Sequence, residues 1–274
     1  MRIALCLFGL TGINNVNGGS GKKIHPKNAF YYYNKNLIQH YDVDVFIHSW
    51  STDFKEQLND LYKPKDFIIE PQREFNQITL NNFGYHEIND LRKHEPYFEA
   101  YKDLSDNEAF EKFETLLWRS YSRWYSTKMS INLKKEYELS NNIEYDFVIS
   151  SRLDIALLKK IKFEKLDKSK FYASFKHGRT DFDKALFDLI FFSNSKIINE
   201  FSEIFDRFHK YSFRPTWTAK EHIEYIGVEV NEILKYEEDY KLLRWNQNYL
   251  ISDYSIYLYV RHFFKQLKRK WLKN

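Results

Sequence analysis

A chain of 274 residues with 43% hydrophobic and 19% aromatic residues can bury a sizeable core and is too rich in apolar anchors to be disordered. Lysine and arginine number 42 against 38 acidic residues, and the resulting net charge of +4 does not indicate nucleic-acid binding. The single cysteine, Cys6, excludes a disulfide framework and a cysteine metal cluster and favours a reducing compartment.

Buried strands separated by polar segments are predicted over the first part of the chain. The run RIALCLFGL at residues 2–10 is apolar almost throughout and passes into the glycine-rich LTGINNVNGGSGKK, as a buried strand entering a loop does. VDVFIHSW at 43–50 and DFIIEPQ at 66–72 offer a second and a third strand. Residues 76–110 show no clear period and indicate a variable insertion of loops and short helices.

Helices and strands alternate over the rest of the chain. A helical period predicts a long helix over 111–139, and YDFVIS at 145–150 follows as a strand. Further strands are predicted at 171–175, 186–195 and 240–246, and helices at 195–211 and 219–236. We therefore expect one α/β domain over residues 1–260, with a Rossmann-type, mostly parallel sheet flanked by helices. No apolar run matches a secretion signal or a membrane span, which favours a cytoplasmic protein.

Two literal motifs suggest phosphate or metal binding. GGSGKK at 18–23 offers glycine backbone and lysine charge to phosphate oxygens, but Val16 and Lys23 break the P-loop pattern. Lys22 stays a candidate phosphate contact, with a plain surface loop as the alternative. The D-x-D of Asp42 and Asp44 precedes a strand, whereas ligands bind at the carboxyl ends of parallel strands. We expect these aspartates to cap a helix or to be solvated rather than to bind metal.

The strand at 145–150 ends in a polar cluster that includes Ser150, Ser151, Arg152 and Asp154, at the edge where ligands bind. Asp154 can hold a divalent cation shared with phosphate oxygens, or a sugar hydroxyl, while Arg152 pairs with phosphate. The alternative is a structural ion pair between the two side chains. Their placement favours the functional interpretation.

Two carboxylates are candidate proton acceptors. Asp188 opens a buried strand, where it either accepts a proton from a substrate hydroxyl or hydrogen-bonds a backbone turn. Glu221 opens a predicted helix after a proline-containing loop and is the second candidate base. His222 beside it is a candidate metal ligand or a hydrogen-bonded histidine. Trp50 at the end of a strand can stack on a sugar or a base, or pack in the core.

The tail at 261–274 places basic residues around Phe264, Leu267 and Trp271 at helical spacing. This composition is typical of an interfacial helix that contacts an anionic membrane surface. It predicts peripheral contact with the inner face of the cell membrane. A solvated terminal helix packed on its own domain is the alternative.

The segments RIALCLFGL, YDVDVFIHSW, LYKPKDFIIE, SYSRWYSTKMSINLKKEYE, YDFVISSRLDI and FDLIFFSNS resemble, in this order, bacterial capsule or lipopolysaccharide glycosyltransferase-like proteins. The resemblance implies a GT-A-type nucleotide-sugar fold in which the R-x-D of Arg152 and Asp154 replaces the usual D-x-D. It makes these two residues donor and metal contacts and Asp188 an acceptor-side carboxylate. Ser126 and Lys128 align with a polar helix face that points into the cleft.

The chain departs from these relatives in one turn. Gly9, a candidate donor contact, opens Gly9-Leu10-Thr11-Gly12 where relatives commonly have a turn like Gly-Gln-Pro-Arg. The arginine of that turn is missing here, and the basic loop around Lys22 is the hypothetical replacement for its phosphate contact.

We therefore expect a glycosyltransferase that moves a sugar from a nucleotide-diphosphate donor to a hydroxyl of a glycan or lipid-linked glycan. Mn²⁺ or Mg²⁺ would bind at Asp154, and Asp188 or Glu221 would accept the proton if the reaction inverts configuration. Removal of the Asp154 carboxylate is expected to abolish activity without unfolding the chain. Two other classes stay open: a P-loop-like kinase or sulfotransferase that uses Lys22, and a non-catalytic scaffold of polysaccharide assembly.

Overall fold

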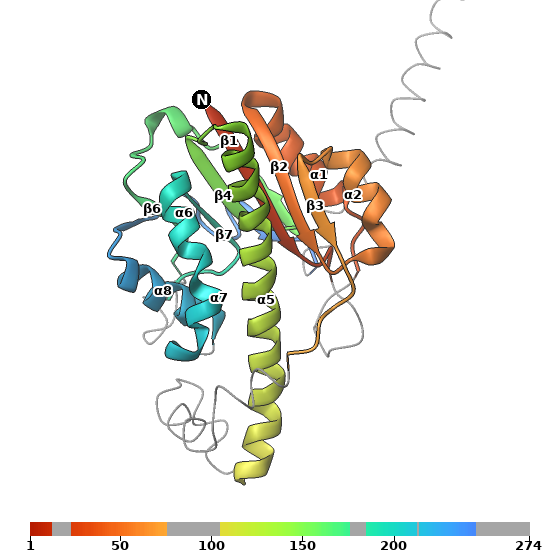
Figure 1. Cartoon of the computed structure of the whole chain (residues 1–274), viewed down its shortest axis with the longest axis vertical. Coiled ribbons are helices and arrows are strands. Elements are labelled where there is room, and N and C mark those ends of the chain that lie inside the picture. The colour runs from red at the N-terminus through yellow and green to blue at the C-terminus, as the bar shows by residue number, and fades with distance from the viewer. Residues whose placement is uncertain (13–22, 76–104, 176–184, 213, 245–274) are drawn as a thin grey trace, which may run out of the picture.

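The computed structural model describes residues 1–12, 23–75, 105–175, 185–212 and 214–244 (Figure 1). Within these residues, seven strands form one sheet in the order β3-β2-β1-β4-β7-β6-β8, and β5 pairs with β9 in a small second sheet. The elements are β1 (Arg2–Gly9), α1 (Lys27–Asn36), β2 (Asp42–Ser49), α2 (Lys55–Tyr62), β3 (Asp66–Ile69), α5 (Asp106–Asn141), β4 (Phe147–Arg152), β5 (Ile155–Leu157), β6 (Phe171–Tyr172), β7 (Ile190–Ser193), α6 (Ser195–Ser202), α7 (Ile204–Arg207), α8 (Pro215–Ile226), β8 (Val230–Asn231) and β9 (Tyr240–Leu242).

The central strands are apolar because both faces of the sheet are covered. Along β1, Ala4 and Cys6 pack into the core on the side of α5, α6 and α8, while Leu5 and Leu7 pack into the core on the side of α1 and α2. This alternation follows from the two-residue period of a strand. The expected α/β architecture, with a mostly parallel sheet flanked by helices, is confirmed.

The sheet changes direction at β4. β1 pairs in parallel with both β2 and β4, and β2 pairs in parallel with β3. β7 then pairs antiparallel with β4, with Ser151 opposite Ile190. The observed strand β7 is shorter than the strand predicted at 186–195, and Asp188 precedes it. Because of the antiparallel pairing, the start of β7 lies at the carboxyl end of β4.

The long helix α5 crosses one face of the sheet, and its N-terminal part extends beyond the carboxyl ends of the central strands (Figure 1). It begins at a capping box in which the Ser105 side chain accepts from the Glu108 N–H and the Glu108 side chain accepts from the Ser105 N–H. It ends at Asn142, whose φ of 50° is left-handed. The prediction over 111–139 is confirmed and extended at both ends.

Two later predictions differ from the structure. The helix predicted at 219–236 begins earlier, with Pro215 in its first turn, and ends at Gly227, whose φ of 75° stops the helix. The residues that follow form β8 instead. The single helix predicted at 195–211 is divided into α6, α7 and a final 3-10 turn. The strand predicted at 240–246 is β9, which pairs with β5 outside the main sheet.

Several predictions concern residues outside the described parts of the chain: the loop with Lys22, most of the insertion at 76–110, and the basic tail at 261–274. Among the described residues, no helix is both long and apolar enough to cross a membrane.

A buried ion pair joins α5 to α6 and to the start of β4. The Lys134 ammonium donates to the Glu138 carboxylate at 2.7 Å, to the Ser195 hydroxyl at 2.6 Å and to the Asn199 amide oxygen at 2.8 Å. Glu138 also accepts from the Tyr145 N–H at 3.0 Å. Both charged side chains are buried, so each depends on the other for compensation.

Replacement of Lys134 by methionine should therefore destabilise the protein by about 3 to 5 kcal/mol, because it leaves the Glu138 carboxylate buried and unpaired. Denaturant unfolding followed by circular dichroism measures this change. Lys135→Met, at the exposed neighbouring position, is the matched control and should change stability by less than about 0.5 kcal/mol. Equal effects of the two substitutions would contradict the prediction.

Candidate functional site

A cavity of about 280 Å³ lies where the carboxyl ends of β1, β2 and β4 meet the N-terminal half of α5. This is the edge where an open α/β sheet binds ligands. Its described lining combines apolar and aromatic side chains with four arginines and one aspartate: Phe8, Gly9, Leu10, Gly12, Trp50, Gln72, Leu116, Trp118, Arg119, Ser120, Ser122, Arg123, Arg152, Asp188, Pro215 and Arg244.

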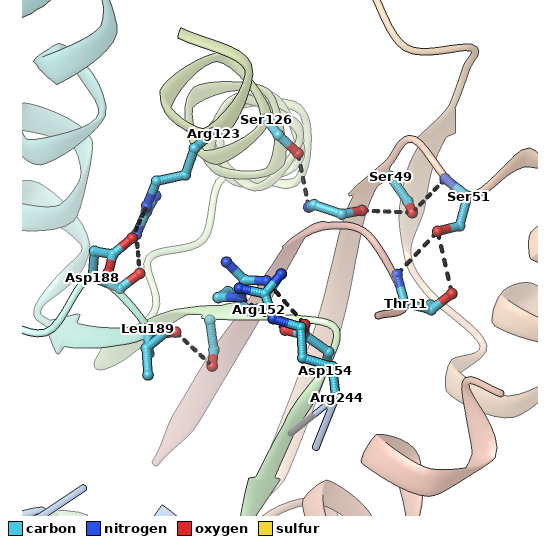
Figure 2. Close-up of polar contacts among 12 residues, drawn as sticks. Thr11, Ser49, Ser51, Arg123, Ser126, Arg152, Asp154, Asp188, Leu189 and Arg244 are labelled. Atoms are coloured by element: carbon cyan, nitrogen blue, oxygen red, sulfur yellow. Dashed lines mark hydrogen bonds and ion pairs between the residues drawn. The ribbon is translucent and has the colours of Figure 1, made fainter. Parts of the chain in front are cut away.

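Hydrogen bonds fix the end of β1 at the cavity (Figure 2). The Gly9 N–H donates to the Ser126 hydroxyl at 2.9 Å, and the Gly9 carbonyl accepts from the Ser49 hydroxyl at 2.8 Å. Gly9 has a φ of 88°, a backbone conformation that residues with a side chain rarely adopt, although a Cβ there would meet no neighbour. Backbone conformation rather than space therefore accounts for glycine at this position.

The turn after β1 is tied to the end of β2 in the same way. The Ser51 hydroxyl accepts from the Thr11 N–H at 3.0 Å and from the Thr11 hydroxyl at 3.2 Å. The Ser51 N–H in turn donates to the Ser49 hydroxyl at 3.0 Å. Figure 2 shows these three side chains as one continuous polar chain. These hydrogen bonds therefore hold the backbone of the turn, which forms part of the cavity wall, in place.

Ser126 also belongs to a chain of hydrogen bonds with His48 and Glu70. The Ser126 hydroxyl lies 2.7 Å from His48 Nδ1, and His48 Nε2 lies 3.1 Å from the Glu70 carboxylate, which Arg73 pairs from its other side. Burial lowers the pKa of His48, so the ring is neutral at neutral pH. The distances are those of a Ser-His-acid triad, but the Ser126 side chain is fully buried. Ser126 therefore positions Gly9 and does not act as a nucleophile.

Arg152 and Asp154 form a bidentate ion pair at the exit of β4. Arg152 Nε and Nη2 donate to the two Asp154 oxygens at 2.8 and 2.9 Å. The Asp154 side chain is 0% exposed, and Arg244 Nε lies 3.8 Å from its Oδ2. Burial opposes protonation of Arg152, yet the Asp154 carboxylate holds the pKa of Arg152 above its ordinary value. The predicted residues do come together, with Arg152 facing the cavity and Asp154 behind it.

A second buried pair joins α5 to the loop before β7. Arg123 Nε donates to Asp188 Oδ2 at 2.9 Å, Nη2 donates to the Asp188 carbonyl, and Nη1 donates to the Thr127 hydroxyl at 2.6 Å. Burial lowers the pKa of Arg123 to about 10, so the group is charged at neutral pH. Although burial disfavours its ionised form, the nearby Arg123 and Arg152 lower the pKa of Asp188. Asp188 is therefore an ionised anchor and a weak base.

The other predicted side chains lie away from the cavity wall. Glu221 on α8 accepts from the Ser212 N–H at 2.7 Å, and burial raises its pKa. Lys128 pairs with Asp206 on α7 at 2.6 Å and so does not point into the cavity as the resemblance implied. Residue 22 lies outside the described parts of the chain. Of the candidates, Gly9, Arg152 and Asp188 line the cavity.

The D-x-D aspartates lie at the start of β2, as expected from their position in the sequence. Asp44 accepts from the Tyr145 hydroxyl at 2.8 Å and lies 3.4 Å from Lys65, and Asp42 lies 3.6 Å from Arg2. Both aspartates form polar contacts at the edge of the sheet opposite the cavity. Arg152 lines the cavity with Asp154 behind it, whereas the literal D-x-D lies at the other end of the strands.

Sequence reasoning missed three arginines of the cavity wall: Arg119, Arg123 and Arg244. Arg123 lies three residues before Ser126 on α5, which places both on one helix face. That spacing was a usable signal. Arg244 follows β9, and its approach to Asp154 depends on the pairing of β9 with β5, for which the sequence carries no local signal.

The residues around Asp154 do not fit a divalent cation. Both of its oxygens already accept from Arg152, and two guanidinium groups surround it. A bound cation would have to reach a fully buried carboxylate against the charge repulsion of both arginines. In the described residues, no group of three or more histidine, cysteine, aspartate or glutamate side chains has a metal-binding arrangement.

Asp154→Asn should destabilise the fold by about 3 kcal/mol, because it leaves the buried Arg152 guanidinium without its anion. The expectation that this substitution leaves the fold intact is therefore replaced. Guanidinium unfolding curves measure the change. The matched control is Asp206→Asn, which removes an exposed partner of Lys128 and should change stability by less than about 1 kcal/mol. An unchanged stability of Asp154→Asn would refute the structural role.

His222 is a buried hydrogen-bonded histidine, the alternative to a metal ligand. Its Nδ1 lies 3.0 Å from the Tyr211 hydroxyl, and its Nε2 lies 3.2 Å from the Glu200 carbonyl. The neutral ring satisfies both contacts, because Nε2–H donates and Nδ1 accepts. Burial lowers the pKa of His222 to about 4.

Because this pKa is lowered, the unfolded chain binds a proton that the folded protein does not. The stabilising effect of neutral His222 is complete above about pH 6.5 and is lost as the pH falls toward 4, by about 2 kcal/mol between pH 7 and pH 5. Unfolding free energies at the two pH values should therefore differ less in His222→Gln than in the parent protein. His209→Gln, at an exposed histidine, should keep the parent difference. A parent-like difference in His222→Gln would contradict the assignment.

Comparisons with known proteins assign no family to this chain. No family model matches it, and no curated protein shows a significant match. Its function has to follow from the chemistry of the cavity.

Proposed function

We propose that the protein is a glycosyltransferase of GT-A type that transfers a sugar from a nucleotide-diphosphate donor to a hydroxyl of a surface-polysaccharide acceptor. One observation carries the proposal: guanidinium groups gather in a cavity at the carboxyl edge of a mostly parallel sheet. Arginine pairs well with phosphate oxygens, and this sheet edge is where α/β folds bind nucleotides. A donor with a diphosphate group fits both features.

The apolar wall suits the rest of the donor or the acceptor sugar. Trp118 and Leu116 are half-buried on α5, and Trp50 stacks on Tyr125 at 5.6 Å between ring centroids. Sugar rings and nucleobases both present apolar faces to aromatic side chains. The wall therefore supports a ligand that joins charged phosphates to a flat or ring-shaped group.

The reaction follows from these surroundings. The acceptor oxygen forms a bond to the anomeric carbon, the bond from that carbon to the diphosphate breaks, and the acceptor proton is released. Arg152 and Arg123 offset the charge that grows on the leaving diphosphate. Asp188 is a weak base because it is paired with Arg123, but it is the acidic side chain among the described lining residues and so is the candidate that receives the proton in an inverting reaction. Glu221 lies off this wall.

The acceptor is proposed as a glycan or a lipid-linked glycan. The basic tail at 261–274 would then hold the enzyme at the inner face of the membrane where such an acceptor is found. This placement rests on the composition of the tail and on the proposed reaction.

A melting screen of UDP-, GDP-, CMP- and ADP-linked sugars tests the proposal. One donor class should raise the melting temperature, since a ligand at a hundred times its dissociation constant adds about 2.7 kcal/mol of stability. The same donor should release its nucleotide when a polysaccharide acceptor is added. A response to ATP or a sulfonucleotide alone, or to no nucleotide at all, would overturn the proposal in favour of a kinase, a sulfotransferase or a scaffold.

Asp188→Asn and Glu221→Gln provide a matched pair within that assay. Asp188→Asn should lower turnover strongly, because Asp188 both lines the cavity and anchors Arg123. Glu221→Gln keeps the shape of a side chain that lies off the wall and should retain turnover within about twofold. The reverse order of effects would assign the base to Glu221.

A further inference from the structure

The structure assigns Arg123, Arg152 and Arg244 as a guanidinium clamp that binds a diphosphate without a divalent cation. The inference rests on the proposed function for the identity of the diphosphate as part of a nucleotide sugar. The binding of the anion itself rests on the charges, contacts and burial of these side chains. Figure 2 shows Arg152 and Arg244 side by side next to Asp154, and Arg123 extending from α5 to Asp188.

Guanidinium groups gather at the cavity. Arg119, Arg123, Arg152 and Arg244 line it together with Asp188. Asp154 lies directly behind the wall, where it pairs with Arg152. An anion bound among these guanidiniums would contact more than one of them.

Burial makes the repulsion between neighbouring guanidiniums energetically significant. The side chains of Arg123, Arg152 and Arg244 are only 8%, 16% and 19% exposed. Burial and the repulsion from Arg152 both lower the pKa of Arg244. The same two effects lower the pKa of Arg123, and burial is the larger of them. These like charges would be relieved by an anion placed among them.

The clamp keeps donors for a ligand. Among the described residues, Arg152 uses two of its five N–H groups, both toward Asp154, and Arg123 uses three, toward Asp188 and Thr127. The remaining N–H groups of these two guanidiniums belong to side chains that line the cavity. Phosphate oxygens accept such pairs in the bidentate geometry that arginine favours.

The guanidiniums are also held in place before any ligand binds. Arg123 lies 3.8 Å from the ring centroid of Trp124 and 4.6 Å from that of Phe8, while Asp188 fixes its Nε edge. Arg152 is fixed by both oxygens of Asp154. Little side-chain order is then lost on binding, which favours affinity for the anion.

The same contacts remove the need for a metal. In a metal-dependent site a carboxylate holds a cation that neutralises the diphosphate, but here the Asp154 oxygens serve Arg152 instead. The carboxylate acts on the ligand through the arginine that it positions. Asp154 is thus a positioning residue, and Arg152 contacts the ligand.

Calorimetric titration of the full chain with inorganic pyrophosphate tests the clamp. We expect saturable binding in EDTA, with an affinity that changes by less than about threefold when EDTA is replaced by Mg²⁺. Arg244→Gln should weaken pyrophosphate binding about tenfold or more, because it removes a charge-assisted contact. Arg207→Gln, which removes an arginine on α7 away from the cavity, is the matched control and should bind as the parent does.

Asp154→Asn separates the two models further, in variants confirmed as folded by circular dichroism. The clamp predicts that pyrophosphate still binds in EDTA, more weakly because Arg152 loses its positioning contact but keeps its charge, whereas a metal site predicts complete loss of binding. If Asp154→Asn does not fold, Arg244→Gln and the EDTA titration still decide. Binding that requires Mg²⁺, or that is unaffected by Arg244→Gln, would overturn the clamp. Metal-free pyrophosphate binding without turnover of any nucleotide sugar would overturn only the proposed function.

Discussion

The positive charge buried at the carboxyl end of β4 is the constraint on which the rest of the site depends. Arg152 leaves the strand with its side chain only 16% exposed, and a buried cation requires an anion within reach. Asp154, two residues further on, supplies it by pairing with both of its oxygens. Arg123 and Arg244 occupy the same region: Asp188 pairs with Arg123, and Asp154 lies 3.8 Å from Arg244. The proposed diphosphate would lie among these guanidiniums.

The change of strand direction next to β4 makes this grouping possible. A parallel neighbour would bring its own carboxyl end to the cavity, whereas the antiparallel β7 brings the residues that enter it. Asp188 and Leu189 therefore lie beside the exit of β4. The Ser151 hydroxyl contacts the Leu189 carbonyl at 3.4 Å and the Tyr33 hydroxyl at 2.7 Å, which explains a polar residue near the end of a buried strand. The neighbouring Ser150 hydroxyl is buried without a hydrogen-bond partner in the described structure, and we have no physical account of it.

Local patterns predicted the strands, the long helix and the edge of the sheet that carries the cavity. They could not predict the direction of β7, because an apolar run looks the same in either orientation. The face of α5 that points to the cavity was predictable but was misjudged. Residues two apart, such as Ser126 and Lys128, project to different sides of a helix, whereas Arg123 and Ser126 share one face. The sequence left two roles open for Asp154, a ligand contact or an ion pair with Arg152, since an R-x-D sequence does not show which way the carboxylate faces; the structure has the ion pair.

That last ambiguity decides the chemistry of the site. A carboxylate whose two oxygens both accept from one guanidinium, and which is 0% exposed with a second guanidinium nearby, is a poor site for a cation because of charge repulsion. Releasing Arg152 would leave it buried beside Arg244 with less compensation. The pair is thus more stable intact, and the charge it presents to the cavity is positive. Similar carboxylates at the ends of buried strands should be assigned to metal only after their arginine neighbours have been placed.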